Sequence, residues 1–193
     1  SPMQPQEVAA AIDGPARVSG LRLEPGLADV IVRDLAGEPG ALPLLSHALL
    51  ETWKRRRGRV LTFSGYHDAG GVRGAIARTA DAVFDELDAT QRALARNVFV
   101  RLVELSEGSE DTRRRVTIAE LTVGPAETAQ LESVLRSLTE ARLVTIGEGG
   151  VELAHEALIR EWPRLRAWLD DDREGLRIHR HLTHAAHDWE ALG

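Results

Sequence analysis

The sequence contains no cysteine, and its apolar runs are short. Without cysteine the chain has no disulfide framework, no thiolate zinc site and no cysteine nucleophile. The stretch from Ala41 to Leu45 is among its longest apolar runs, far below the roughly 20 residues that a membrane-spanning helix needs. We therefore expect no membrane contact from this segment, and the absence of cysteine fits a cytoplasmic protein.

Lysine is almost absent as well, since Lys54 is the only one among 24 basic residues. A Walker A loop, G-x-x-x-x-G-K-[ST], needs a lysine followed by serine or threonine, whereas Lys54 is followed by Arg55. The chain alone therefore cannot cradle a triphosphate in P-loop fashion, and we expect it not to be an enzyme by itself. The excess of arginine over lysine is typical of a GC-rich bacterial genome.

What is present predicts a folded protein of ordinary kind. A chain of 193 residues with 43% hydrophobic content buries one core or two small ones. The formal net charge of −6 argues against nonspecific affinity for nucleic acid or for an anionic membrane.

The first half is predicted to be helical from the spacing of its apolar residues. One stripe comprises Leu27, Val30, Ile31 and Leu35, and a second comprises Leu42, Leu45, Leu49 and Trp53. Pro43 suits the first turn of the second helix, and Gly58 is the predicted end of that helix. The glycine-rich stretch from Arg59 to Gly74 is predicted to be a loop, with Tyr66 attaching it to the core. Helices resume after it.

The second half changes pattern. Asp88 with Gln91, and Thr117 with Glu120, match the capping box that opens a helix. Residues 143–146 and 151–154 alternate apolar and polar around a glycine-rich turn, which predicts a β-hairpin. With a short strand at 115–118, the order is helix, strand, helix, helix, hairpin, as in a winged helix. A C-terminal helix would follow, interrupted at Pro163 and with Asp170 to Asp172 capping its last part.

The predicted fold is therefore mainly α: a helical domain, then a winged helix with a small β-hairpin wing and a C-terminal helix. We assign residues 1–87 to a helical, lid-type domain, residues 88–169 to the winged helix, and residues 170–193 to a connecting helix.

His155 is the most informative candidate for chemistry. Glu156 follows it, but a metalloprotease helix needs a second histidine where Ile159 stands, so that interpretation fails. Strand alternation puts His155 on the same side as Leu153, at the edge of the core where strand passes into helix. Two interpretations stay open, a packed structural histidine and a ring N–H that donates to a ligand phosphate.

Other polar groups are explained more simply as structure. His184 and His187 have a spacing that two metal ligands can share, but no third ligand joins them, so no metal site is assigned. The basic run from Lys54 to Arg59 complements the dipole at a helix C-terminus. The glycines at 70, 71 and 74 are read as a solvated loop rather than an anion site.

A DNA-binding winged-helix transcriptional regulator is the alternative function, because the third helix of such a module usually enters the major groove. That helix, roughly Ala126 to Arg142, has a net negative charge, and the wing carries Glu148 and Glu152 without a basic residue. Both features suit phosphate contact poorly, so we do not expect nucleic acid as a partner.

Four stretches resemble one known class of proteins. ALPLLSHALLETW, from Ala41 to Trp53, resembles the helical-domain signature of bacterial STAND signal-transduction NTPases of the novel, WD-repeat-associated class. VELAHEALIREWP, from Val151 to Pro163, resembles the end of their winged helix. GGVRGAI, from Gly70, and EDTRRRV, from Glu110, are similar to motifs at the corresponding positions of those NTPases. The resemblance covers nearly the whole chain.

The resemblance implies two nucleotide-contacting residues. A proline in a G-x-P-like word of the helical domain typically touches the base; Pro43 matches it best, with Ala41 in place of the glycine, and Pro39 is a weaker candidate. A histidine in an M-H-D word typically contacts the ADP β-phosphate. His155 matches it, flanked by Ala154 and Glu156 in place of methionine and aspartate.

The function implied is a regulatory, nucleotide-clamping module of an ATP/ADP molecular switch. ADP or ATP, with Mg²⁺, would be bound only together with an upstream P-loop domain that this chain lacks, and the native full-length protein would be an ATPase. The upstream domain and a downstream sensor or effector are the expected partners, and oligomerisation on activation is compatible with this class.

Overall fold

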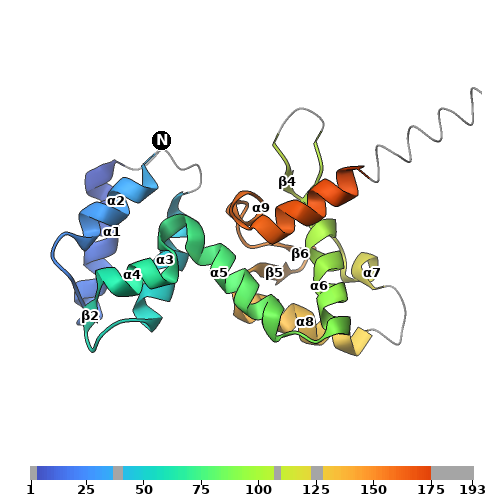
Figure 1. Ribbon diagram of the computed structural model, residues 1–193, viewed down its shortest axis with the longest axis horizontal. Coiled ribbons are helices and arrows are strands. Elements are labelled where there is room, and N and C mark those ends of the chain that lie inside the picture. The colour runs from blue at the N-terminus through green and yellow to red at the C-terminus, as the bar shows by residue number, and fades with distance from the viewer. Residues whose placement is uncertain (1–3, 37–40, 107–109, 123–127, 175–193) are drawn as a thin grey trace, which may run out of the picture. The chain divides into compact units, whose positions relative to one another are not determined.

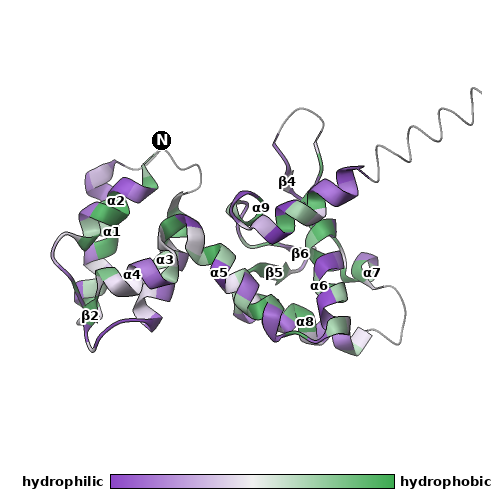
Figure 2. Cartoon of the chain, viewed as in Figure 1, coloured by the Kyte–Doolittle hydropathy of each residue, from purple (hydrophilic) through white to green (hydrophobic). Residues whose placement is uncertain are grey.

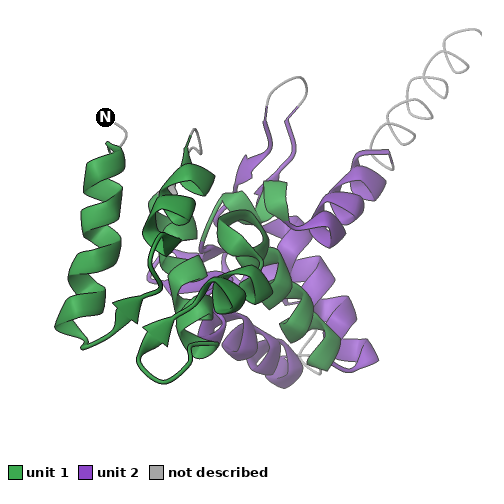
Figure 3. Cartoon of the chain, turned by 60° about the vertical axis from the view of Figure 1, so that its left-hand side comes forward, with its two compact units in different colours: residues 1–86, 155–161 green, residues 87–154, 162–193 purple. Residues whose placement is uncertain are grey.

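The computed structural model describes residues 4–36, 41–106, 110–122 and 128–174 (Figure 1). It is mainly helical with small β-hairpins, which confirms the predicted fold class at that level. Within the described ranges, no helix is both long enough and apolar enough to cross a bilayer. The chain forms two compact units, residues 1–86 with 155–161 and residues 87–154 with 162–193 (Figure 3).

Unit 1 is a set of helices with one short pair of strands. Its elements are α1 (Pro5–Val18), β1 (Arg22–Leu23), α2 (Leu27–Leu35), α3 (Ala41–Lys54), β2 (Val60–Leu61), α4 (Phe63–Ala69), α5 (Gly71–Glu86) and α9 (Ala157–Glu161). β1 and β2 pair in parallel. Helix α3 packs against α4 and α5, and the short α9 packs against α5.

The first helix was not predicted from the sequence. α1 has a capping box between Gln4 and Glu7 and a proline in its first turn. Its buried residues are Val8, Ile12 and Ala16, spaced four apart, so that they lie on one side of the helix. Both α1 and α2 carry hydrophilic and hydrophobic bands (Figure 2). Gly14 and Pro15 within the helix hide this pattern from a propensity reading.

The predicted loop from Arg59 to Gly74 was wrong, because it contains α4 and the start of α5. The Thr62 hydroxyl caps α4 by accepting from the Gly65 amide at 3.0 Å. Gly70 ends the helix with φ of 98°, and a Cβ there would lie 2.8 Å from the Gly74 carbonyl carbon. The glycines therefore permit a sharp turn between two helices rather than a long loop.

Tyr66 attaches this region to the core, as predicted. It is buried, its hydroxyl donates to Asp34 Oδ2 at 2.7 Å, and it accepts from the Val72 amide at 3.2 Å. Burial, followed by the bond to the Asp34 carboxylate, raises the pKa of Tyr66 well above its usual range.

Unit 2 contains the predicted helices and hairpin. Its elements are α6 (Ala89–Arg101), β3 (Val103–Glu104), β4 (Thr112–Arg113), α7 (Ile118–Leu121), α8 (Thr128–Glu140), β5 (Val144–Gly147) and β6 (Gly150–Leu153), followed by a helix over 163–174. The strand predicted at 115–118 was wrong: only Val116 makes an isolated bridge there, and the short strands β3 and β4, which were not predicted, precede it. β5 and β6 form the predicted hairpin, and Val116 bridges Val151 of β6. Assignment of this unit to the winged-helix class stays a prediction.

Both predicted capping boxes are confirmed. Asp88 accepts from the Gln91 amide at 2.9 Å and the Gln91 side chain accepts from the Asp88 amide at 3.1 Å. Thr117 and Glu120 make the equivalent pair at the start of α7. The first four amides of a helix have no partner within the helix. In a capping box, the side chain of the N-cap residue accepts from the amide three residues later, and the side chain of that later residue accepts from the N-cap amide.

Three aromatic rings pack against one another in unit 2. The rings of Phe99 and Trp162 are 4.9 Å apart, and those of Trp162 and Trp168 are 5.3 Å apart, both edge to face. A new helix begins at Pro163, as the predicted interruption requires, and it continues through Asp170–Asp172 instead of being capped there. The remaining part of the predicted connecting helix, residues 175–193, lies outside the described residues.

The domain division predicted from the sequence stays a prediction. The contact-defined units separate between Glu86 and Leu87, and residues 155–161 group with unit 1 although they follow the hairpin of unit 2. This grouping is important for the candidate site because it includes His155.

Candidate functional site

Helix α3 has an apolar surface on its exposed side as well as on its buried side. The buried side of α3 differs from the apolar stripe that was predicted to face the core. Leu44, Leu45 and Ala48 are buried, whereas Leu42 is 53% exposed and Trp53 is 41% exposed. Pro43 lies in the first turn of α3 and is exposed. Because α3 packs against both α4 and α5, it buries a different set of residues from the one that simple periodicity selects.

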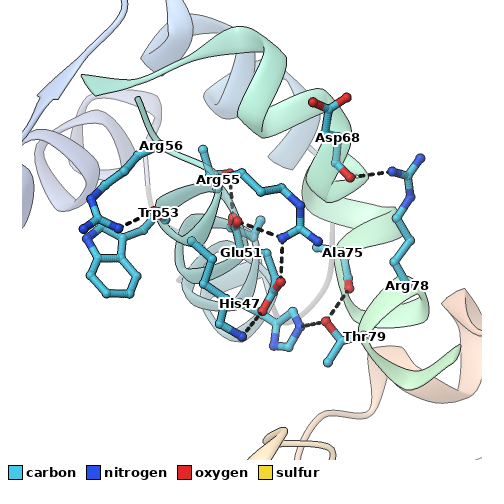
Figure 4. Close-up of polar contacts among 12 residues, drawn as sticks. His47, Glu51, Trp53, Arg55, Arg56, Asp68, Ala75, Arg78 and Thr79 are labelled. Carbon is cyan, nitrogen blue, oxygen red and sulfur yellow. Dashed lines mark hydrogen bonds and ion pairs between the residues drawn. The ribbon is translucent and has the colours of Figure 1, made fainter. Parts of the chain in front are cut away.

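His47 lies one turn after Pro43 and is only 3% exposed. Its Nε2 is 3.0 Å from the Thr79 hydroxyl oxygen, and that hydroxyl donates to the Ala75 carbonyl at 3.0 Å (Figure 4). Thr79 has one hydroxyl proton and uses it on Ala75, so it accepts from His47. This arrangement predicts that His47 carries a proton on Nε2.

His155 packs beside His47 within unit 1. Their ring centroids are 6.4 Å apart with the planes at 71°, an edge arrangement. His155 is half-buried, and its carbonyl accepts from the Leu158 amide at 3.1 Å as the chain turns into α9. The two predicted site residues thus lie near α3: Pro43 on its first turn and His155 against the residue one turn later.

The C-terminal end of α3 is held by charge. Glu51 is 6% exposed, with Lys54 Nζ at 2.6 Å from Oε1 and Arg55 Nη1 at 2.7 Å from Oε2. Burial acts to raise the pKa of Glu51, but the bonds from Lys54 and Arg55 together hold it below its ordinary value.

The basic run after α3 is used in structure, which supports the helix-end interpretation. Arg55 donates to the Glu51 carbonyl at 3.0 Å and Arg56 to the Trp53 carbonyl at 2.9 Å. The Arg56 guanidinium also lies 4.2 Å from the centre of the Trp53 ring. Figure 4 shows the two side chains next to each other. These cations satisfy the last carbonyls of the helix.

The other candidates from the sequence have structural roles or lie outside the described residues. Among the glycines, the Gly74 amide donates to the Gly70 carbonyl at 3.0 Å. No group of three metal-ligating side chains occurs in the part of the chain that the structure describes. Pro39 and the four histidines at 179, 181, 184 and 187 lie outside that part.

Unit 2 offers little to support the DNA-binding alternative. Arg114 pairs with Glu120 at 2.9 Å and Arg115 with Glu152 at 2.9 Å, so these arginines are neutralised within the unit. Arg113 donates to the Leu153 carbonyl at 3.3 Å. The exposed residues of α8 include Glu132 and Glu140. An acidic helix beside paired arginines is a poor surface for phosphate contact.

Comparison with known proteins decides the family. The model of the family described as Novel STAND NTPase 1 matches residues 1–193. The chain belongs to this family. The match confirms the resemblance to STAND NTPases. Searches of curated proteins and of solved structures found no match.

Within this novel STAND family chain, sequence reasoning did not single out His47 and Thr79. His47 lies within the ALPLLSHALLETW stretch. Its signal was a histidine among the apolar residues of α3, a position where a buried ring needs a partner. Thr79 had no sequence signal, because it lies 32 residues away on α5.

Proposed function

We propose that this chain is the regulatory, nucleotide-clamping module of a STAND-type ATP/ADP switch. In this role His155 donates to a phosphate oxygen of ADP and Pro43 contacts the base. The upstream P-loop domain would hold ADP or ATP with Mg²⁺, and the bound nucleotide supplies the phosphate charge that distinguishes the two states. The chain lacks a Walker A lysine and is not catalytic by itself.

The observation that supports this role most is that His155 lies against α3, the helix whose first turn contains Pro43. Pro43 and His47 are four residues apart on α3, hence neighbours on the helix surface. The His155 ring lies 6.4 Å from that of His47. Pro43 and His155, far apart in sequence, are thus both associated with α3.

The residues fit a nucleotide held mainly by another domain. Half-burial of His155 partly desolvates its ring, so a contact with phosphate is less screened than on an open surface. Pro43 is an exposed apolar residue suited to the face of a base. Leu42 and Trp53 extend an exposed apolar surface along α3, and a covering protein domain would remove it from water.

The switch requires different affinities in the two states. A charge-assisted contact from His155 to phosphate is worth roughly 1.5–3 kcal/mol, which is about one to two orders of magnitude in the equilibrium between them. Binding of ADP would hold the His155 segment, and exchange for ATP would release it toward a downstream sensor or effector. We place the protein in the cytoplasm of a bacterium.

The test is ADP affinity of the native-length protein by titration calorimetry at one salt concentration. His155→Ala should weaken ADP binding about tenfold or more. Pro43→Ala should weaken ADP and ATP alike, since it removes a contact with the base rather than with phosphate. The matched control is His67→Ala, an exposed histidine of α4. Unchanged ADP affinity in His155→Ala would refute the phosphate contact.

A further inference from the structure

A groove with aliphatic walls runs beside α8 in unit 2. Its volume is about 320 Å³, and it is lined by Ile118, Glu132, Leu135, Arg136, Thr139, Glu140 and Ile146. Leu135 is 3% exposed, whereas Ile118 and Ile146 are each 46% exposed. An apolar cavity of about 150 Å³ already accommodates a benzene ring. This groove therefore has room for a large apolar side chain, and its two isoleucines stand open to water.

The rim of the groove has a regular charge pattern. Glu132, Arg136 and Glu140 follow one another at four-residue spacing on α8, so they lie in a row on one side of the helix, about 6 Å apart. All three are exposed. Among the described residues none of them makes an ion pair, in contrast to Arg115 and Glu152 on the neighbouring elements. The row is negative, positive, negative.

This pattern selects the kind of partner. A helix laid along a groove presents side chains at spacings of three and four residues, which matches the row on α8. If it carries basic, acidic and basic residues in that order, three opposite charges meet at once. A second copy of α8, antiparallel and centred on the groove, would oppose Arg136 with Arg136 and Glu132 with Glu140. Duplex DNA on this groove would bring its phosphates against the carboxylates of Glu132 and Glu140, which repel them.

We propose that this groove binds an amphipathic helix of a partner protein. The helix inserts a large apolar side chain between Ile118 and Ile146 and presents basic, acidic and basic side chains to Glu132, Arg136 and Glu140. This interaction involves unit 2 alone and does not depend on nucleotide binding by His155.

The probe is a fluorescein-labelled, alanine-based helical peptide with Arg, Leu, Glu, Leu and Arg at positions i, i+3, i+4, i+7 and i+8. The comparison peptide has the three charges reversed. Fluorescence anisotropy with the full chain should give an affinity about tenfold higher for the first peptide, because each exposed ion pair contributes modestly and three act together. Equal affinities would overturn the charge assignment.

Charge exchange gives the sharper test. Arg136→Glu should weaken binding of the first peptide about tenfold, and a peptide with arginine in place of its central glutamate should restore it. Ile146→Asp should weaken binding of the first peptide to the otherwise wild-type chain, and binding of the central-arginine peptide to the Arg136→Glu chain. Val18→Asp, at an apolar residue of unit 1 that is 91% exposed, should leave peptide binding unchanged. Circular dichroism on each variant checks folding.

Three other outcomes would overturn the proposal. Concentration-dependent dimerisation of the chain by sedimentation, abolished by Arg136→Glu, would assign the groove to a second copy. Displacement of the peptide by duplex DNA at low salt would assign it to nucleic acid. Binding of the matched peptide that survives both Arg136→Glu and Ile146→Asp would mean that it binds elsewhere.

Discussion

The bond between His47 and Thr79 offers a direct test of how the candidate site is built. Thr79→Val keeps the shape of the side chain and removes the hydroxyl, so the Nε2–H of His47 loses the acceptor that lies 3.0 Å away. His47 is 3% exposed, and water cannot readily replace that acceptor. The loss of one buried hydrogen-bond partner costs about 1–3 kcal/mol.

Urea unfolding followed by circular dichroism measures this loss. With a slope of about 2 kcal/mol/M, the midpoint of Thr79→Val should fall by about 0.5–1.5 M. Thr79→Ser is the matched control, because it keeps the hydroxyl and loses one half-buried methyl, worth less than about 0.8 kcal/mol. NMR of the ring nitrogens supplies a second readout: the wild type and Thr79→Ser should show His47 with its proton on Nε2.

Two results would refute the reasoning. Equal stability of Thr79→Val and the wild type would mean that the hydroxyl contributes nothing to holding His47. A wild-type spectrum with the proton of His47 on Nδ1 would mean that Thr79 donates to the ring instead of accepting from it. If both predictions hold, His47 is a fixed support for the ring of His155.

Two further predictions concern the scaffold around the two units. Gly150→Ala should destabilise unit 2 by more than about 2 kcal/mol, since Gly150 has φ of 117° and an added Cβ would lie 2.2 Å from the Val116 carbonyl oxygen; Gly147→Ala, where no atom lies within 4 Å, is the control in the same unfolding assay. Glu51→Gln should make the free energy of unfolding depend less on pH at the acid end of the range. The pKa of Glu51 is lowered in the folded state, so its contribution is present above the ordinary value of 4.5 and is lost as pH falls through the folded value. Unfolding measured from pH 3 to pH 7, with exposed Glu86→Gln as control, checks this, and equal slopes in the two variants would contradict it.

Local features of the fold were predictable because their causes lie within a few residues. The capping boxes at Asp88 and Thr117 need only a partner three positions on. The hairpin of β5 and β6 follows from alternation around a glycine-rich turn. The interruption at Pro163 follows from the missing amide of proline.

The errors arose where short-range rules compete. The glycines around α4 predict a loop, although Gly70 is the end of one helix and Gly71 the start of the next. Gly14 and Pro15 concealed α1. In both cases burial of an apolar face outweighs weak helix propensity, and that burial depends on helices elsewhere in unit 1.

The sequence by itself determined the mainly helical fold class, the absence of a Walker A loop and membership of the novel STAND family, because each depends on residue types and their order along the chain. It also drew attention to Pro43 and His155. Only the tertiary structure decided that α3 buries Leu44 rather than Leu42, that Thr79 supports His47, and that His155 joins unit 1. These contacts connect residues far apart in sequence, and no local periodicity encodes which of the many possible partners a folded chain brings together.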